Sequence, residues 1–303
     1  MANLKEIRTR IASVASTRQI TSAMKMVAAA KLKKAQDAVT NFRPYIHKMQ
    51  EIMEHVVSSA ADDPDNIFAE DRDYNRVLIV VITSNRGLCG AFNSNAVKEA
   101  IHLAERKYSR FLASDKIRFL TIGKRGYDML RRYQVQLDDP NIEIVEHLTY
   151  EKAAELAQSL MDAFLAKRYD CIDIVYNEFV NAATQKVICK QLLPLLPEEQ
   201  QNKGGGKDKK NGGELLNNDY IFEPTRKYIL NELIPQDLRL SFYAALLDSV
   251  ASEFGARMTS MHQATDNAST LIQELTLQYN KARQAAITNE ILEIVGGAEA
   301  LKG

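Results

Sequence analysis

The first 58 residues of the chain repeat apolar side chains at alternating spacings of three and four, the pattern of a coiled-coil helix. Counted in heptads from Leu4 and Ile7, thirteen of the sixteen seam positions are apolar, and the exceptions are Arg18, Thr21 and Lys25. A helix over residues 3–58 would be about 84 Å long. No globular core built by 303 residues can surround such a helix, so it needs a partner helix.

The end of the chain supplies that partner. Beyond Pro235 a seven-residue repeat returns in two rows, which start at Leu247 and Val250, and eleven of the fourteen positions are apolar. Because no proline interrupts residues 238–295, we expect one helix of about 87 Å. The pair Gly296-Gly297 is a typical stop signal and predicts its end.

Two helices of matched length at opposite ends of a chain most simply form an antiparallel coiled coil. The rise per residue then places residue x beside about residue 296 − x, so Thr21 would lie near Leu275. The polar cluster of Arg18, Thr21 and Lys25 weakens the seam, and we interpret it as a place where the helix pair meets another protein. The alternative is that these polar residues only fix the register. Pro44 predicts a bend or a local defect in the first helix.

The charges are unevenly distributed, although 39 basic and 39 acidic residues cancel over the whole chain. Residues 1–48 carry ten Lys or Arg against Glu6 and Asp37, a net charge of +8. Residues 49–75 carry eight acids against Arg72, a net charge of −7. The acidic stretch 61–75 contains a proline and is predicted to be a linker.

The middle of the chain alternates strand-like runs with helical stretches, which predicts a three-layer, Rossmann-like α/β domain. A polar, glycine-rich insertion at 200–213 predicts a disordered loop. The expected segments are a coiled-coil helix at 1–60, the linker at 61–75, the α/β domain at 76–196, a flexible insertion at 197–222 and a second coiled-coil helix at 223–303. The expected strands are 77–83, 117–122, 142–145, 171–176 and 186–193, and the expected helices are 93–112, 124–133 and 150–168.

Composition excludes several classes of protein. No apolar run approaches the roughly 18 residues that a membrane-spanning helix needs, and the first residues do not form a secretion signal. Three widely spaced cysteines argue against a disulfide framework and for a reducing compartment. Five histidines without paired spacing predict no metal site, and the balanced charge speaks against a protein that coats nucleic acid.

The most enzyme-like segment is residues 83–93, a loop between a predicted strand and a predicted helix. Such a loop can hold phosphate on its backbone amides, but these glycines match neither the dinucleotide fingerprint nor a P-loop. We interpret Gly87 and Gly90 as permitting a tight strand-to-helix turn. Cys89 beside Arg86 would be a candidate nucleophile, yet the sequence supplies no base for it. No catalytic residue, cofactor or metal is therefore predicted.

Several motifs near both ends of the chain occur in the same order as in a known protein family. They lie at residues 7–14, 17–28, 257–258, 264–268, 279–291 and 293–298. Together they resemble the gamma subunit of F-type rotary ATP synthases over essentially the whole chain, except the insertion at 200–213. The loop at 83–93 is similar to the family pattern with two departures, Asn85 in place of an acid and Ala91 in place of a glycine. These departures weaken an ion-binding interpretation of the loop and leave a turn role intact.

The resemblance implies a non-catalytic central shaft that couples proton flow through a ring of c subunits to ATP synthesis or hydrolysis in beta subunits. The implied partners are the hexamer of alpha and beta subunits, the epsilon subunit and the c ring, with no nucleic acid and no direct nucleotide binding. The implied location is peripheral to the cytoplasmic face of a bacterial inner membrane, preferred over the mitochondrial matrix because no transit peptide is evident.

The matching motifs also imply contact residues. The contacts with beta would be Met24, Lys25, Met26, Arg257, Arg283, Gln284 and Thr288. An apolar pivot inside the head would be formed by Ile291, Leu292, Ile294, Val295 and Leu301. 

Two other functions are weighed against the shaft. A free-standing coiled-coil scaffold or regulator would close its seam on itself and have no affinity for a hexameric ATPase. An α/β enzyme would instead use the loop from Ser84 to Asn93 and turn over a nucleotide or phosphoester.

Overall fold

The computed structural model describes residues 4–58, 68, 75–111, 116–195 and 226–300. The chain divides into two compact units, residues 1–31 with 257–303 and residues 32–256. Two long helices, α1 (Leu4–Ser58) and α7 (Arg226–Ala300), contribute to both units. The insertion predicted at 200–213 and nearly all of the linker predicted at 61–75 lie outside the described residues.

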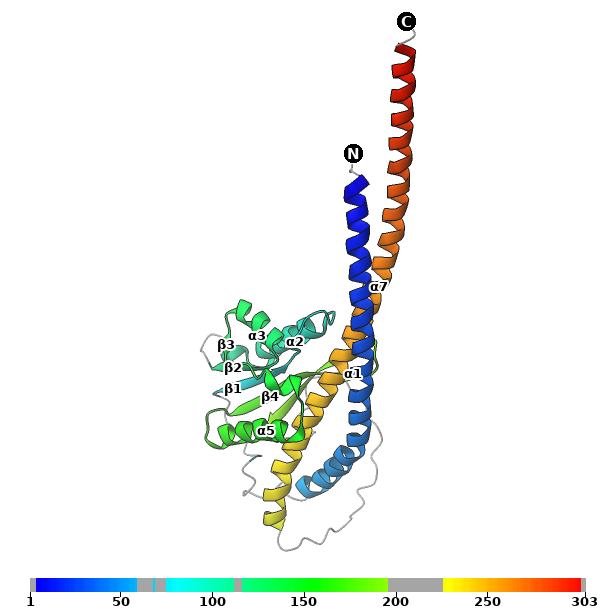
Figure 1. Cartoon of the computed structure of the whole chain (residues 1–303). Coiled ribbons are helices and arrows are strands. Elements are labelled where there is room, and N and C mark those ends of the chain that lie inside the picture. Colours follow the sequence, from blue (N-terminus) through cyan, green and yellow to red (C-terminus); the bar gives the residue numbers. More distant parts are fainter. Residues whose placement is uncertain (1–3, 59–67, 69–74, 112–115, 196–225, 301–303) are drawn as a thin grey trace, which may run out of the picture. The chain divides into compact units, whose positions relative to one another are not determined.

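In the first unit α1 and α7 run antiparallel, so that the blue and red ends of the chain point the same way in Figure 1. The coiled coil predicted from the heptads is confirmed, because the buried side chains follow the predicted seam. These buried residues are Ile7, Thr21 and Ala28 on α1, and Arg257, Met261, Ala268 and Leu275 on α7.

The register differs from the prediction. Thr21 Oγ1 lies 2.9 Å from Thr265 Oγ1, so residue x of α1 is level with about residue 286 − x of α7. The expectation that Thr21 lies near Leu275 is wrong by about ten residues. It rested on assumed helix ends, and a seven-residue repeat by itself does not say which heptads face each other.

The second seam row of α7 is also shifted by one position. The predicted row contains Leu271, whose side chain is 42% exposed, whereas its neighbour Ile272 is half-buried. Because both residues are apolar, the sequence allows either spacing, and the packing of α1 selects the second. The observed row consists of Thr265, Ile272 and Tyr279.

Beyond the level of Leu4, α7 continues without α1 beside it (Figure 1). All described side chains from 287 to 298 are exposed. The predicted stop at Gly296-Gly297 is wrong, since the helix runs to Ala300. Glycine lowers helix propensity by about 1 kcal/mol but does not force the chain out of a helix.

The second unit contains a five-stranded sheet of order β3-β2-β1-β4-β5. The first four strands are parallel, and β5 is antiparallel to β4 (Figure 1). Parallel neighbours joined by helical crossovers are what the alternating pattern predicts. The strands are β1 (Val77–Ile82), β2 (Ile117–Ile122), β3 (Gln136–Leu137), β4 (Cys171–Phe179) and β5 (Gln185–Leu193).

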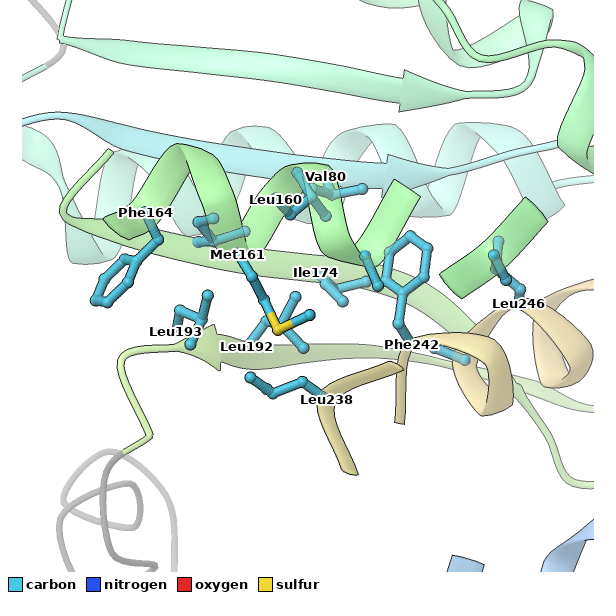
Figure 2. Close-up of a cluster of buried hydrophobic side chains, with 14 of the residues drawn as sticks. Val80, Leu160, Met161, Phe164, Ile174, Leu192, Leu193, Leu238, Phe242 and Leu246 are labelled. Atoms are coloured by element: carbon cyan, nitrogen blue, oxygen red, sulfur yellow. The ribbon is translucent and has the colours of Figure 1, made fainter. Parts of the chain in front are cut away.

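Helices cover both faces of this sheet, which confirms the three-layer α/β domain. One face packs β1 residues such as Val77 and Ile79 against α2 (Phe92–Lys107). The other face packs Val80 and Ile174 against α5 (Tyr150–Leu165) and against the part of α7 around Phe242, as Figure 2 shows. Every residue of β1 is buried, as expected for a central parallel strand.

Most predicted elements are found, with one exception at the sheet edge. Residues 142–145 were expected to form a strand, but the chain forms a short helix, α4 (Glu143–Glu146), and the edge strand is β3. The run Ile142 to Val145 is too short for its period to distinguish a strand from a helical turn. The remaining short helices are η1 (Ser109–Phe111), α3 (Lys124–Leu130) and η2 (Arg131–Tyr133).

Residues 32–58 of α1 and 226–256 of α7 belong to this second unit, and the two helices also contact each other there. Phe42 of α1 meets Tyr243 of α7 edge to face, with ring centroids 5.1 Å apart. Gln236 Nε2 donates a hydrogen bond of 3.4 Å to the Tyr45 hydroxyl. Pro44 and Pro235 lie within helices that continue on both sides of them.

Candidate functional site

Of the predicted contact residues on α1, Met26 lies on the outward side of the seam. Thr21 and Ala28 are buried against α7, whereas Met26 between them is 64% exposed. Met24 and Lys25 are half-buried. An exposed methionine beside a lysine offers a partner both an adaptable apolar contact and a charge.

Three predicted contact residues on α7 lie in the part of the helix that has no neighbouring α1. Arg283, Gln284 and Thr288 are all exposed, and the Thr288 hydroxyl donates to the Gln284 backbone oxygen at 2.9 Å. The observed register puts Lys25 level with about residue 261, so Gln284 lies about 35 Å further along the helix axis. The structure therefore does not bring the two groups together, and they would contact a partner at two separate levels.

Arg257 differs from the other predicted contacts, because only 8% of its surface is exposed. Its side chain is enclosed by the chain itself and already has interaction partners there. A burial of this degree was not expected from the sequence, where an arginine on a long helix reads as a surface residue.

The end of α7 exposes a cluster of large apolar side chains, which we call the apolar tip. Ile291, Leu292, Ile294 and Val295 are 53%, 63%, 71% and 54% exposed. Leu301, predicted to belong to the same group, lies outside the described residues. Leaving this much apolar surface in water is unfavourable, and such patches mark interaction sites.

The sequence did not single out five other exposed apolar residues of the first unit. They lie outside the heptad rows from which the coiled coil was predicted, or on the row of α7 that the structure shifts by one position. An apolar residue that the seam does not need is the only signal by which they could have been found. These residues are Ile20, Val27, Leu271, Leu277 and Ile287.

The loop at 83–93 is held by hydrogen bonds among its own side chains. Asn93 Oδ1 accepts from the Ser84 backbone nitrogen at 2.9 Å, and Asn93 Nδ2 donates to Ser84 Oγ at 2.8 Å. Leu88 is held at a φ of 64° with its side chain exposed, and Cys89 is only 1% exposed. Since a buried thiol is inaccessible to a substrate, this geometry supports a turn and not a nucleophile.

The described residues contain no group of three or more His, Cys, Asp or Glu side chains placed to hold a metal ion. Within the same residues, no helix has the length and apolarity needed to cross a membrane.

Comparison with known proteins gives this arrangement a family. A family model described as ATP synthase matches residues 3–301. The ATP synthase gamma chain of Flavobacterium psychrophilum is 51% identical over 303 residues, and the match covers all of both chains. This chain belongs to the ATP synthase gamma chain family. A gamma chain from a Geobacter species is 43% identical over 304 residues, again with full coverage of both chains.

Solved structures share this fold. A chain from the central stalk and c ring of the Tetrahymena thermophila mitochondrial ATP synthase is 29% identical, with a TM-score of 0.55. The match covers 81% of this chain and 99% of that chain. A chain from the Euglena gracilis mitochondrial ATP synthase shares the fold at 23% identity with a TM-score of 0.62, over 98% of this chain and 94% of that one. The resemblance read from the sequence motifs is thus confirmed at the level of the gamma chain family.

Proposed function

We propose that this gamma chain is the central-stalk rotor subunit of an F-type proton-translocating ATP synthase. It would couple proton flow through the c ring mechanically to ATP synthesis or hydrolysis in beta subunits, and it would break or form no bond itself. The observation that carries this proposal is the apolar tip, at the end of a helix that outruns its partner. An isolated scaffold has no reason to keep such a surface in water, whereas a shaft that ends inside another protein does.

The coupling would act by changing the relative free energies of conformations. A beta subunit exists in open and closed states, and a shaft that contacts one state better than the other shifts their populations. The first unit is asymmetric in the way that this mechanism requires. Up to the level of Leu4 it presents two helices, and beyond that level α7 alone continues among the residues that the structure describes.

The proposed contacts with beta fall at two levels. At one, Met24, Lys25 and Met26 would approach beta, and at the other Arg283, Gln284 and Thr288 would do so. Charged and amide groups suit contacts that form and break in each turn. A hydrogen bond to a partner carboxylate is strong in one orientation, and because it is directional it is lost when the shaft turns away. Arg257, predicted as a further contact, would need its side chain to leave its enclosed position.

The apolar tip would serve as a pivot within the head. Apolar side chains make no directional bonds, so the free energy of a tip such as Ile291 and Ile294 in an apolar sleeve would depend little on angle. The proposed partners are the alpha and beta hexamer, the epsilon subunit and the c ring. The proposed location is peripheral, at the cytoplasmic face of a bacterial inner membrane.

Reconstitution separates this function from that of a free-standing scaffold. The full chain is mixed with alpha and beta subunits of the Flavobacterium psychrophilum enzyme, whose gamma chain is 51% identical. We expect ATPase-active particles that contain the chain. A matched variant, Ile291→Asp with Ile294→Asp, should assemble poorly because it places two charges in the proposed pivot. A chain that stays free of the hexamer while keeping its helical content would support the scaffold instead.

A further inference from the structure

Four cationic side chains converge where strands β1, β2 and β4 of the second unit begin. Arg76 immediately precedes β1, Lys116 immediately precedes β2 and Arg118 is the second residue of β2. Arg168 lies three residues before β4. Because Val77 of β1 is the register partner of both the first residue of β2 and the first residue of β4, these strand beginnings are adjacent.

A cavity of about 410 Å³ opens at this edge, and we call it the basic pocket. Its volume lies within the range of small-ligand sites. None of the proposed contacts with beta belongs to it. Its lining consists of Arg76, Lys116, Arg118, Arg168 and Tyr169.

Part of this positive charge is already paired. Arg118 Nη1 lies 2.7 Å from Asp138 Oδ1, and the Tyr169 hydroxyl donates to Asp138 Oδ2 at 3.1 Å. A second carboxylate among the described residues, Asp170, accepts hydrogen bonds of 2.9 Å from the backbone nitrogens of Asn75 and Arg76. Burial and Asp138 raise the pKa of Tyr169, so its hydroxyl stays protonated at neutral pH.

The guanidinium groups of Arg76 and Arg168 form no ion pair or hydrogen bond with other residues that the structure describes. They therefore face the cavity with unused donors, beside the Lys116 ammonium group, whose hydrogen bond to Asn75 Oδ1 is long at 3.4 Å. Like charges that converge in this way repel one another, and an anion between them relieves the repulsion.

The donors select a compact anion. Guanidinium groups bind phosphate through two parallel hydrogen bonds, and an ammonium group adds a point charge. Among the described residues, the lining has no Leu, Ile, Val, Met or Phe that could hold a fatty-acid chain. We propose that the basic pocket binds a phosphate group, either free or at the exposed end of a larger ligand. This inference does not rest on the proposed rotor function.

The test uses the full chain and pyrophosphate as the probe, titrated by calorimetry at low salt. The variant Arg76→Gln with Arg168→Gln should bind pyrophosphate at least tenfold more weakly, because each removed guanidinium takes away charge-assisted hydrogen bonds. The control variant, Lys98→Gln with Lys186→Gln, removes two exposed charges of the same sign elsewhere in this unit. It should bind like the unmodified chain, and circular dichroism should show that both variants are folded.

Two further probes separate the possible sources of the phosphate. Vesicles containing phosphatidic acid that compete with pyrophosphate would assign the group to a lipid headgroup, whereas pyrophosphate binding without vesicle binding would assign it to a free ion. Either result supports the proposal. Absence of pyrophosphate binding, an equal loss in the control variant, or binding of a polyglutamate peptide without binding of pyrophosphate would overturn it.

Discussion

The hydroxyl oxygens of Thr21 and Thr265 lie 2.9 Å apart, although the residues are 244 positions apart in the chain. This contact shows directly which residues of α1 and α7 are level with each other in the first unit. It also determines how much of α7 outruns α1, because each residue of shift would lengthen or shorten the unpaired end by about 1.5 Å.

A cysteine at each of these positions should form a disulfide under mild oxidation. The pair Thr21→Cys with Thr265→Cys brings two thiols to adjacent seam positions, within the separation that a disulfide spans. Non-reducing electrophoresis would measure the crosslink in a Cys189→Ser background, since Cys89 and Cys171 are buried. The matched control, Thr21→Cys with Leu275→Cys, tests the register expected from the sequence. Efficient crosslinking of that pair in place of the first would contradict the observed register.

The heptads predicted that these helices pair, and their matched lengths at opposite ends of the chain favoured an antiparallel pair. They did not predict the register. The repeat is satisfied by any shift of whole heptads, and Leu271 and Ile272 are both apolar, so the sequence does not choose between two neighbouring rows. Arg257 lies on the predicted row that starts at Val250, so the repeat places it on the seam, and its burial was missed because an arginine was expected to keep its charge in water.

Tyr108→Phe should lower the free energy of unfolding of the second unit by about 2 kcal/mol, because it removes a hydrogen bond to a buried charge. The Tyr108 hydroxyl lies 2.7 Å from Asp173 Oδ2, and Asp173 is 2% exposed. The Lys107 ammonium group lies 3.2 Å from Asp173 Oδ1 and 3.1 Å from Asp173 Oδ2, and it would still bind this carboxylate after the substitution.

Denaturant unfolding followed by circular dichroism would measure this loss. The control is Tyr169→Phe, which also removes a tyrosine hydroxyl bound to a carboxylate, at 3.1 Å from Asp138. Because Tyr169 is half-buried and water can replace the bond, its loss should be below about 1 kcal/mol. Equal losses of unfolding free energy in the two variants would show that burial does not strengthen the hydrogen bond between Tyr108 and Asp173.

Asp248 should make the second unit less stable as the pH rises from about 4 to about 6. Burial raises the pKa of Asp248 to about 6, with a smaller raising effect from Glu178 and an opposing effect from Arg43. Its Oδ1 atom has no hydrogen-bond partner among the described residues. Since the folded state then binds more protons than the unfolded state, whose aspartate pKa is about 3.9, ionisation costs stability.

Asp248→Asn should therefore stabilise the protein by about 1–2 kcal/mol at pH 7, and the gain should vanish below about pH 4. Unfolding free energies at a series of pH values would measure both effects. The exposed Asp139 is a suitable control position, because Asp139→Asn removes the same charge from a side chain that is already in water. A stability gain for Asp248→Asn that is the same at pH 4 and pH 7 would rule out ionisation as its cause.

Gln284→Leu should weaken coupling without unfolding the chain, since Gln284 is exposed on the unpaired part of α7. In reconstituted complexes we expect ATP-driven proton pumping to fall several-fold while the helical content stays unchanged. The control is Gln273→Leu, an exposed glutamine on the same helix that is not a proposed contact. Normal pumping in the Gln284 variant would remove this residue from the proposed contacts with beta.

The central claim is that this chain turns inside a hexamer of alpha and beta subunits. The most direct measurement fixes reconstituted hexamers to a surface, attaches a bead to the chain and records its motion when ATP is added. We predict unidirectional rotation that depends on ATP and that is impaired by Ile291→Asp with Ile294→Asp. A bead that stays at one angle while the same particles hydrolyse ATP would contradict the account.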